Sequence, residues 1–351
     1  MNWREDPITV ADLGEFGLIA AIQALLPPGS AGPVGIGDDA AVVSAPDRRV
    51  VASTDMLVEG RHFRRDWSAA YDIGVKAAAQ NLADVAAMGA SPTALLVGFA
   101  TPGDLPVAWA EDLVRGIAGE CARAGAFVVG GDVSDADSVV LGITALGDLA
   151  GRDPVTRAGA RAGDRLAICG HPGRSAAGLA LLRAGLGTGG ESGAGPGAEA
   201  GQGAEAGLGA GPGQRPQDAG FAGLVASHRR PRPPYPSGPE AAALGATSMI
   251  DISDGLVSDL NHVAEASGAA IDIETALLPD DPDLRSAAAA LGADRLRWVL
   301  TGGEDHALAA TFPPQARLPA HWSVIGSVRP GRGVAVDSQP AHGLAGWRHF
   351  R

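Results

Sequence analysis

Acidic residues meet short apolar, strand-like runs at five places along this chain. The acids are Asp38 and Asp39 in "GIGDDAAVV" (35–43), Asp55 after "VVAST", Asp132 in "VVGGD", Asp251 and Asp254 in "MIDISD", and Glu304 and Asp305 in "LTGGED". One such acid is ordinarily a turn residue or a helix cap, but five instances of the same arrangement indicate a shared role. Because α/β folds bind ligands at the ends of their strands, we expect these acids to meet at one site.

Strand-like and helix-like runs alternate, which predicts an α/β or α+β fold. Residues 49–58 and 138–149 are rich in Val, Ile and Thr and predict strands. Residues 108–125 predict a helix that ends at Gly125. A second predicted helix, residues 253–268, would begin at the cap residue Asp254 and bury Leu256, Leu260 and Val263 before it ends at Gly268.

A third predicted helix, "YDIGVKAAAQNLADVAAMGA" (71–90), carries two stripes. Apolar Val75, Ala79, Leu82 and Ala86 form one, and Lys76, Gln80 and Asp84 form the other, with Asn81 beside it. A solvent-exposed polar face is the simplest interpretation of the second stripe. The helix is so rich in alanine, however, that we expect it to be buried on most sides, and buried polar side chains need partners.

Length and composition predict two domains, residues 1–149 and 150–351, with a boundary at the turn-rich segment near 150. Residues 184–220 are almost entirely Gly, Ala, Pro, Gln and Glu, which predicts a disordered loop. The "GLGTGG" in this segment (185–190) lacks the preceding strand and following helix that a dinucleotide-binding motif requires.

Charge and composition exclude several classes of protein. The formal net charge of −13 disfavours nucleic acid and anionic membranes as partners. We find no signal peptide and no 18-residue uncharged apolar run, so we expect no membrane span and a cytoplasmic location. The two cysteines, Cys121 and Cys169, lie in apolar surroundings, which argues against a disulfide framework and a cysteine metal site.

Clustered carboxylates without paired His or Cys suit a hard cation, Mg²⁺ or Mn²⁺. Such ions would also supply the positive charge that an acidic protein needs in order to bind phosphates. The chain has no H-E-x-x-H zinc motif, no Walker A motif and none of the protein-kinase motifs. If it uses ATP, it does so on another fold.

Taken together, the motifs resemble the thiamine-monophosphate kinase family, part of the ATP-binding superfamily of aminoimidazole ribonucleotide synthetase. The matching stretches, in the family's order, are "GEFGLIA" (14–20), "GIGDDAAVV", "STDMLVEGRHF" (53–63), "NLADVAAMGA" (81–90), "VGGDVS" (129–134), "PVTRAGARAGD" (154–164), "DISDGLVSDL" (251–260), "LTGGEDHAL" (300–308) and "GWRHF" (346–350). Departures from the family pattern are Ala83, Val133 and His306, where Ser, Thr and Tyr are common.

The resemblance implies a fold and a reaction. The fold has two α/β domains: an N-terminal mixed sheet that binds ATP and metal and forms a barrel with its mate in a homodimer, and a C-terminal α/β sandwich. ATP would phosphorylate thiamine monophosphate to thiamine diphosphate by direct in-line transfer, assisted by several Mg²⁺ ions in the cleft between the domains.

The resemblance also implies roles for individual residues. The metal ligands would be Asp39, Ser53, Thr54, Asp55, Asp84, Asp132, Asp251 and Asp254, with Asp38 as a ligand or a neighbour through water. ATP would contact Gly131, Asp132, Arg157 and Ser253, and thiamine monophosphate would contact His62, Glu304 and Trp347. No residue would act as a catalytic base, and Asp55, Asp132 and Arg157 would support the metals in stabilising charge.

Several alternatives stay open. His62 and Trp347 could be structural, Asp305 could cap the segment after it, and the two glycines before Glu304 are typical of close ligand approach. A cyclase like aminoimidazole ribonucleotide synthetase shares the metal motifs. A non-catalytic sensor of Mg–nucleotide would lack the second-substrate residues. A selenophosphate synthetase needs a reactive Cys near the N-terminus, and the hydrogenase-maturation relative ends in a cysteine tail; this chain has neither.

Overall fold

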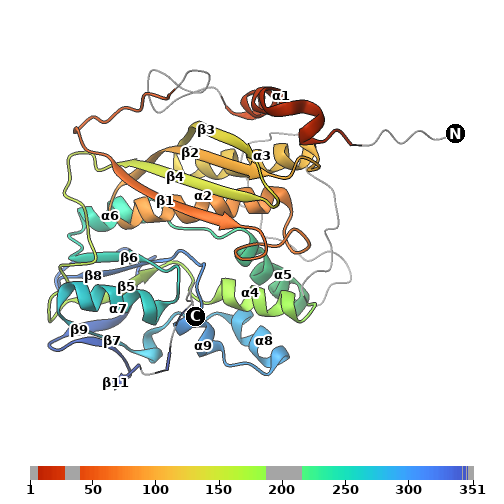
Figure 1. Ribbon diagram of the computed structural model, residues 1–351. Helices are drawn as coiled ribbons and strands as arrows, with labels where there is room; N and C mark the ends of the chain where they lie inside the picture. Colours follow the sequence, from red (N-terminus) through yellow and green to blue (C-terminus); the bar gives the residue numbers. More distant parts are fainter. Residues whose placement is uncertain (1–6, 28–39, 187–215, 342, 345, 347–351) are drawn as a thin grey trace.

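The computed structural model describes residues 7–27, 40–186 and 216–346, except 342 and 345, and leaves the side chains of 216–219 undescribed. Its strands form two sheets, one of four strands and one of seven. Each sheet with its helices makes one lobe of the molecule (Figure 1). The chain passes from the first sheet to the second between Asp148 and Arg165.

The first sheet is mixed, with the order β1-β4-β2-β3, and only β2 and β3 are parallel. Its strands are β1 (Val51–Val58), β2 (Ser91–Thr101), β3 (Phe127–Asp135) and β4 (Val140–Asp148). Helices α2 (Ala70–Ala87) and α3 (Val107–Ala124) pack on one face, and α1 (Val10–Leu25) lies beside α3 (Figure 1). The predictions of β1, β4 and a helix ending at Gly125 are confirmed.

Helix α2 is buried along most of its length, as its composition predicts. It packs against α3 with backbone touching backbone. A Cβ atom on Gly74 would lie 2.0 Å from the carbonyl oxygen of Leu113, and one on Gly116 would lie 2.1 Å from that of Tyr71. Only glycine fits at these two positions, because the backbones of the two helices lie in contact there.

The second sheet has the order β11-β10-β7-β9-β5-β8-β6. Its strands are β5 (Arg165–Cys169), β6 (Ser248–Asp251), β7 (Ala270–Ile273), β8 (Leu308–Phe312), β9 (Ser323–Arg329), β10 (Gly333–Val336) and β11 (Gln339–Pro340). The surrounding helices are α4 (Arg174–Arg183), α5 (Pro216–Arg229), α6 (Ser237–Ala243), α7 (Leu256–Ser267), η1 (Thr275–Leu277), α8 (Pro282–Leu291) and α9 (Arg295–Thr301). Alternate residues of β8 supply apolar clusters on the two faces of the sheet: Ala309 packs with α7, and Leu308, Ala310 and Phe312 pack toward α6.

Helix α7 buries Leu256, Leu260 and Val263 and ends at Gly268, as predicted, but the predicted cap is wrong. The cap position is Gly255, which has no side chain with which to cap. Asp259, inside the first turn, instead accepts hydrogen bonds from the backbone N–H groups of Ser253, Asp254 and Gly255, each at 3.0 Å. One buried carboxylate therefore fixes the whole loop before the helix.

The disordered loop predicted for residues 184–220 extends too far at its C-terminal end. Helix α4 ends at Arg183, and α5 begins at Pro216, so that residues 216–220 are helical rather than part of a loop. The prediction for residues 187–215 lies outside the described residues. Both cysteines are free and buried, and no helix that the structure describes is long and apolar enough to cross a bilayer.

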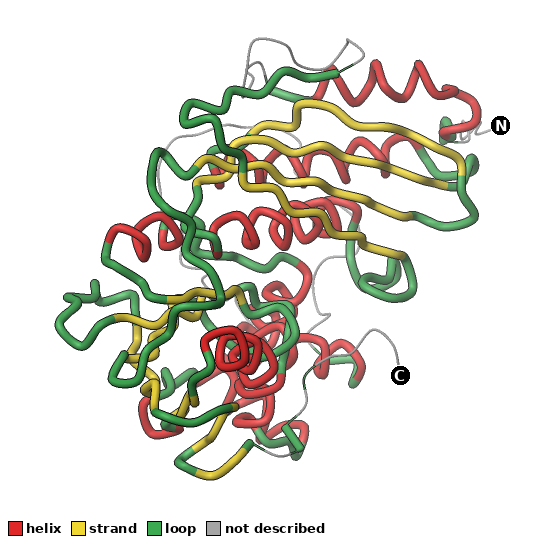
Figure 2. The backbone as a smooth tube through the Cα atoms, turned by 60° about the vertical axis from the view of Figure 1, so that its left-hand side comes forward, coloured by secondary structure: helices red, strands yellow, loops and turns green. Residues whose placement is uncertain are grey.

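The two lobes meet along α2. Figure 2 shows the helical layer on the side of the first sheet that faces the second lobe. At the end of α2, a Cβ on Gly238 of α6 would lie 2.0 Å from the carbonyl oxygen of Ala86, and Val155 donates a backbone hydrogen bond of 3.0 Å to Met88. Because of this close contact, α2 lies at the bottom of the cleft and lines it.

Candidate active site

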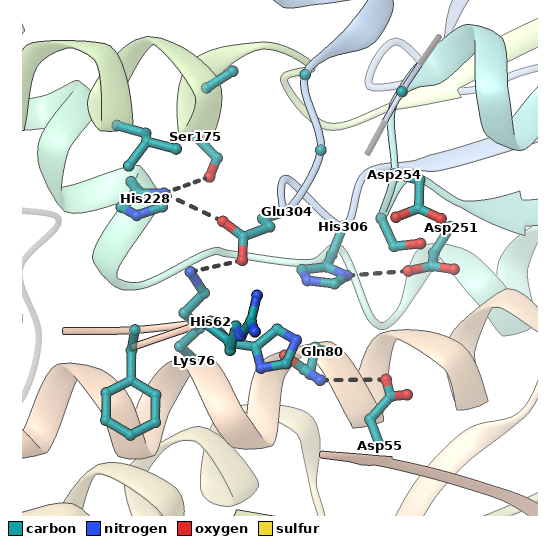
Figure 3. Close-up of a pocket in the computed structure, with 18 of the residues that line it drawn as sticks. Asp55, His62, Lys76, Gln80, Ser175, His228, Asp251, Asp254, Glu304 and His306 are labelled. Atoms are coloured by element: carbon teal, nitrogen blue, oxygen red, sulfur yellow. Dashed lines mark hydrogen bonds and ion pairs between the residues drawn. The ribbon is translucent and has the colours of Figure 1, made fainter. Parts of the chain in front are cut away.

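A cavity of about 870 Å³ lies between the lobes. It is lined by the end of β1 and the turn after it, the polar stripe of α2, the helices α4 and α5, the loop after β6 and the segment 301–306 (Figure 3). Four acids from the sequence analysis line it together: Asp55, Asp84, Asp251 and Asp254. The prediction that acids from separate strand-like runs meet at one place is confirmed for Asp55, Asp251, Asp254 and Glu304, although Asp55 lies inside β1 and not at its end. Asp84 joins them from α2.

The polar stripe of α2 connects these acids to β1. Ser53 Oγ donates to Asp84 at 2.6 Å, and the backbone N–H of Asp55 donates to Asn81 Oδ1 at 3.0 Å. Gln80 Nε2 donates to Asp55 at 3.3 Å (Figure 3). The predicted partners of the buried stripe are therefore the acids themselves and their neighbours on β1.

The acids repel one another. Burial raises the pKa of Asp84 to about 7, and the nearby charges of Asp251 and Asp55 act in the same direction. Carboxylates held together against repulsion, with oxygen as the only ligand atom, fit a hard divalent cation. Among the described residues no group of three His, Cys or acidic side chains is close enough to hold a metal by itself, and Asp38 and Asp39 lie outside the described residues.

His306 contacts one of the four acids, Asp251. Its Nδ1 is 3.1 Å from Asp251 Oδ2, and both side chains are buried. Burial alone would lower the pKa of His306, but the hydrogen bond with Asp251 and the charges of Asp251 and Asp84 raise it. His306 stands where Tyr is common in the family, and its ring contacts Asp251.

The segment 302–306 packs directly on the loop 252–255. Glu304 N–H donates to the carbonyl oxygen of Ser253 at 2.8 Å, and His306 N–H donates to that of Ile252 at 2.9 Å. A Cβ on Gly303 would lie 2.2 Å from the Ser253 carbonyl oxygen. This glycine therefore serves the contact between two loops of the protein. It also lines the cavity, so its predicted role in ligand approach stays a prediction.

Glu304 lies at the end of the cavity away from the acids and has two partners. Lys76 Nζ of α2 is 3.0 Å from its Oε1, and His228 Nδ1 of α5 is 3.4 Å from its Oε2 (Figure 3). Ser175 Oγ of α4 is 3.0 Å from the same His228 nitrogen. Burial, followed by the charge of Lys76, lowers the pKa of His228 to about 3, so this ring is neutral.

These contacts keep Glu304 ionised. Burial would raise the pKa of Glu304, but the charge of Lys76 lowers it below its ordinary value. The side chain remains 36% exposed, so the carboxylate faces the cavity. An anion held in this way can bind a cationic ligand.

Asp305 has a structural role, although not the one considered in the sequence analysis. Its carboxylate accepts backbone hydrogen bonds from Gly173 at 2.6 Å and Ser175 at 2.7 Å, at the start of α4. It therefore caps a helix far earlier in the chain, and not the segment that follows it. Burial raises its pKa to about 7 in spite of these two bonds.

His62, Ser253 and Arg157 also line the cavity. The His62 ring accepts a hydrogen bond of 3.0 Å from the Val58 backbone N–H through Nδ1, which holds the ring at the end of β1. Trp347 lies outside the described residues.

The structure leaves Thr54, Gly131 and Asp132 away from this cavity. Thr54 Oγ1 is 3.1 Å from Thr144 Oγ1, on the face of the sheet opposite α2, because side chains alternate along a strand. Gly131 and Asp132 lie on β3, three strands from β1, and line a second cavity of about 120 Å³. Three strand spacings amount to about 14 Å, so these assignments stay predictions.

Sequence reasoning missed Ser175, His228 and Asp259, and it noted Lys76 only as part of a stripe. Lys76 had a signal, since it shares helical spacing with Gln80 and Asp84. Ser175 and His228 had none, because they reach Glu304 only through the packing of α4 and α5.

Comparisons with known proteins agree with this geometry. A family model for the N-terminal domain of AIR synthase related proteins matches residues 37–149. The chain is 46% identical to thiamine-monophosphate kinase of Mycobacterium tuberculosis over 97% of this chain and 93% of the relative. It is 40% identical to that of Corynebacterium glutamicum over 99% and 96% of the two chains.

Solved structures agree as well. The crystal structure of thiamine-monophosphate kinase from Stenotrophomonas maltophilia K279a is similar with a TM-score of 0.75 and 29% identity, over 92% of this chain and 96% of that one. AaThiL complexed with AMPPCP and TMP is similar with a TM-score of 0.74 and 31% identity, over 99% and 100%.

Residues 37–149 thus form an N-terminal domain of the AIR synthase related type. Within that class, the chain belongs to the thiamine-monophosphate kinase family.

Proposed function

We propose that this protein transfers the γ-phosphoryl group of ATP to thiamine monophosphate and forms ADP and thiamine diphosphate. The observation that carries the proposal is the division of charge in one cavity: four acids at one end and the ionised Glu304 at the other. The first end suits metal-bound phosphates and the second a cationic ring. The similar AaThiL structure contains AMPPCP, a methylene analogue of ATP, together with TMP.

In the proposed reaction, a phosphate oxygen of thiamine monophosphate forms a bond to the γ-phosphorus, and the bond from that phosphorus to the β-γ bridging oxygen breaks. Because the second pKa of a phosphate ester is about 6, the attacking oxygen carries no proton at neutral pH. The site therefore needs no general base. The residues of the chain position two anions and keep water out, and Arg157 at the cavity wall supplies a cation for the phosphates of ATP.

Asp55, Asp84, Asp251 and Asp254 would hold Mg²⁺, with Ser53 next to them through Asp84. Mg²⁺ bound there would neutralise charge on the transferred group. Asp38, Asp39, Thr54 and Asp132 complete the proposed metal set. Gly131 and Ser253 complete the proposed ATP contacts, and His62 and Trp347 complete those for thiamine monophosphate.

We also propose a homodimer formed through the open face of the first sheet, in a cytoplasmic enzyme. That face leaves Met56 of β1 58% exposed and Leu96 of β2 37% exposed, on either side of β4, and exposed apolar side chains on one face of a sheet indicate an interface. Light scattering tests the dimer: the wild type should have twice the mass of the chain, and Met56→Glu should shift it toward the monomer. A wild type that remains a monomer at high concentration would contradict this part of the proposal.

The reaction is tested with the purified protein, thiamine monophosphate, ATP and Mg²⁺. Chromatography should show thiamine diphosphate and an equal amount of ADP, and EDTA should abolish both. ADP formed without thiamine diphosphate would refute the transfer to thiamine monophosphate. No turnover at all would refute the proposal and favour the non-catalytic sensor.

A further inference from the structure

Lys76 differs from the other basic residues of the chain. Of the 27 Lys and Arg residues, it is the single lysine. It is also only 3% exposed, on a helix whose other buried residues, apart from Asp72 and Asn81, are small or apolar. A buried ammonium group costs free energy unless it is paired, so its presence at the wall of the cavity needs an explanation.

The position of Lys76 along α2 gives the first part of that explanation. Lys76, Gln80 and Asp84 follow one another at four-residue spacing, which places them about 6 Å apart along the helix axis. Asp84 is one of the four acids at the end of the cavity where we propose that Mg²⁺ binds, which we call the metal end. Gln80 contacts Asp55, another of these acids. Lys76 contacts Glu304 at the other end. The ammonium group therefore lies beside Glu304, at one end of a polar stripe whose other end, Asp84, belongs to the group of acids.

The shape of the substrate gives the second part. This inference rests on the proposed function, in which the γ-phosphate lies at the acids and the cationic ring lies at Glu304. The phosphate of thiamine monophosphate must then lie between them, beside Lys76. Within the described residues the Lys76 ammonium, which has three N–H donors, forms an ion pair with Glu304 alone.

We propose that Lys76 binds the phosphate of thiamine monophosphate, and that the Lys76–Glu304 ion pair is exchanged when the substrate enters. The substrate carries a positive ring and a negative phosphate. Glu304 turns to the ring and Lys76 to the phosphate, so that each buried charge has a partner before and after binding. This exchange makes Lys76 a specificity residue, since thiamine without its phosphate offers a partner to Glu304 only.

Four other cations line the cavity and provide a contrast: Arg61, Arg64, Arg157 and Arg183. All four are exposed. Arg183 is close enough to influence His228, so it shares the general electrostatic field of this end of the cavity. If the phosphate were recognised only through the positive electrostatic field of the cavity, removal of Arg183 would weaken binding of thiamine monophosphate as much as removal of Lys76.

The test compares the affinities for thiamine monophosphate and thiamine by calorimetry, with full-length protein, Mg²⁺ and AMPPCP present. Lys76→Met should weaken binding of thiamine monophosphate about 10- to 150-fold, the range for a lost hydrogen bond to a charged group. Binding of thiamine should change far less, and Lys76→Arg should restore part of the discrimination. Arg183→Gln should leave the ratio of the two affinities unchanged.

Two results would overturn the inference. Equal weakening of both ligands in Lys76→Met would mean that Lys76 only positions Glu304, and an equal change of the ratio in Arg183→Gln would mean that the field alone acts. Either can occur in a protein that still forms thiamine diphosphate, so failure here is distinct from failure of the proposed function.

A measurement on the wild type does not depend on the folding of any variant. Protein labelled with ¹⁵N at the lysine side chain gives one ammonium signal, because the chain has one lysine. Thiamine monophosphate and inorganic phosphate should each shift that signal. A signal that neither phosphate compound moves would refute the contact.

Discussion

Replacing Gly303 with alanine should damage both stability and activity, because two loops meet at this residue. The added Cβ would lie 2.2 Å from the Ser253 carbonyl oxygen and 3.2 Å from the Asp254 carbonyl carbon. Since both obstacles are backbone, no side chain can move away to relieve the clash. The segment 302–306 and the loop 252–255 would have to separate by about 1 Å.

The cost follows from the bonds that join these loops. A separation of about 1 Å lengthens the hydrogen bonds from Glu304 N–H and His306 N–H, now 2.8 and 2.9 Å, beyond bonding range. Each bond contributes about 1 kcal/mol, and forcing a methyl group into a packed site costs about 1 to 3 kcal/mol. We therefore expect a loss of about 3 to 5 kcal/mol in the free energy of unfolding.

Urea denaturation followed by circular dichroism measures this loss, and steady-state kinetics measures the effect on the site. Because Glu304 moves with the segment, we expect kcat/KM for thiamine monophosphate to fall about 100-fold, the cost of misplacing a group by 1 Å. Gly223→Ala in α5 is the matched control, since its Cβ would meet only Arg174 Nη2 at 3.5 Å. The control should be within about 1 kcal/mol of the wild type. A Gly303→Ala protein as stable and active as this control would refute the argument.

Three further predictions concern the acids and the low-complexity segment. Asp55→Asn should lower kcat at least about 100-fold and leave the circular dichroism spectrum unchanged, because it removes a carboxylate from the metal end; near-normal turnover would remove Asp55 from the site. Asp305 has a folded-state pKa of about 7, raised from 3.8, so the folded state holds the proton more tightly and this stability is lost as the pH rises from about 4 to about 7, by at most about 4 kcal/mol. Urea denaturation at pH 5 and pH 8 should show a smaller fall for Asp305→Asn than for the wild type, and equal falls would contradict the raised pKa. Replacing residues 187–215 with a short Gly/Ser linker should change the free energy of unfolding by less than about 1 kcal/mol and leave kcat unchanged; a large loss of either would assign the segment a role.

The sequence predicted features that depend on neighbours along the chain. The strands β1 and β4, the end of α3 at Gly125 and the buried face of α7 follow from side-chain periodicity and from glycine as a helix stop. The sequence also predicted that acids from separate strand-like runs meet. The physical reason differs from the predicted one, because Asp55 and Asp251 belong to different sheets and meet only where the two lobes pack.

The cap of α7 and the role of Gly303 could not be predicted in the same way. Both Asp254 and Asp259 are reasonable caps in sequence, and the choice of Asp259 depends on a carboxylate that turns back to three backbone N–H groups. Gly303 faces a carbonyl group fifty residues away. These contacts arise only when the two loops pack.

The sequence by itself determined the family, through motifs that follow one another in the family's order. It also predicts a hard cation, since the acidic chain lacks paired His or Cys. The tertiary structure decided which residues surround Glu304. Lys76, His228 and Ser175 come from three helices, and no local pattern links them. Their meeting depends on burial: an ionised carboxylate at the seam between two lobes needs partners, and only the packing of α2, α4 and α5 determines which side chains supply them.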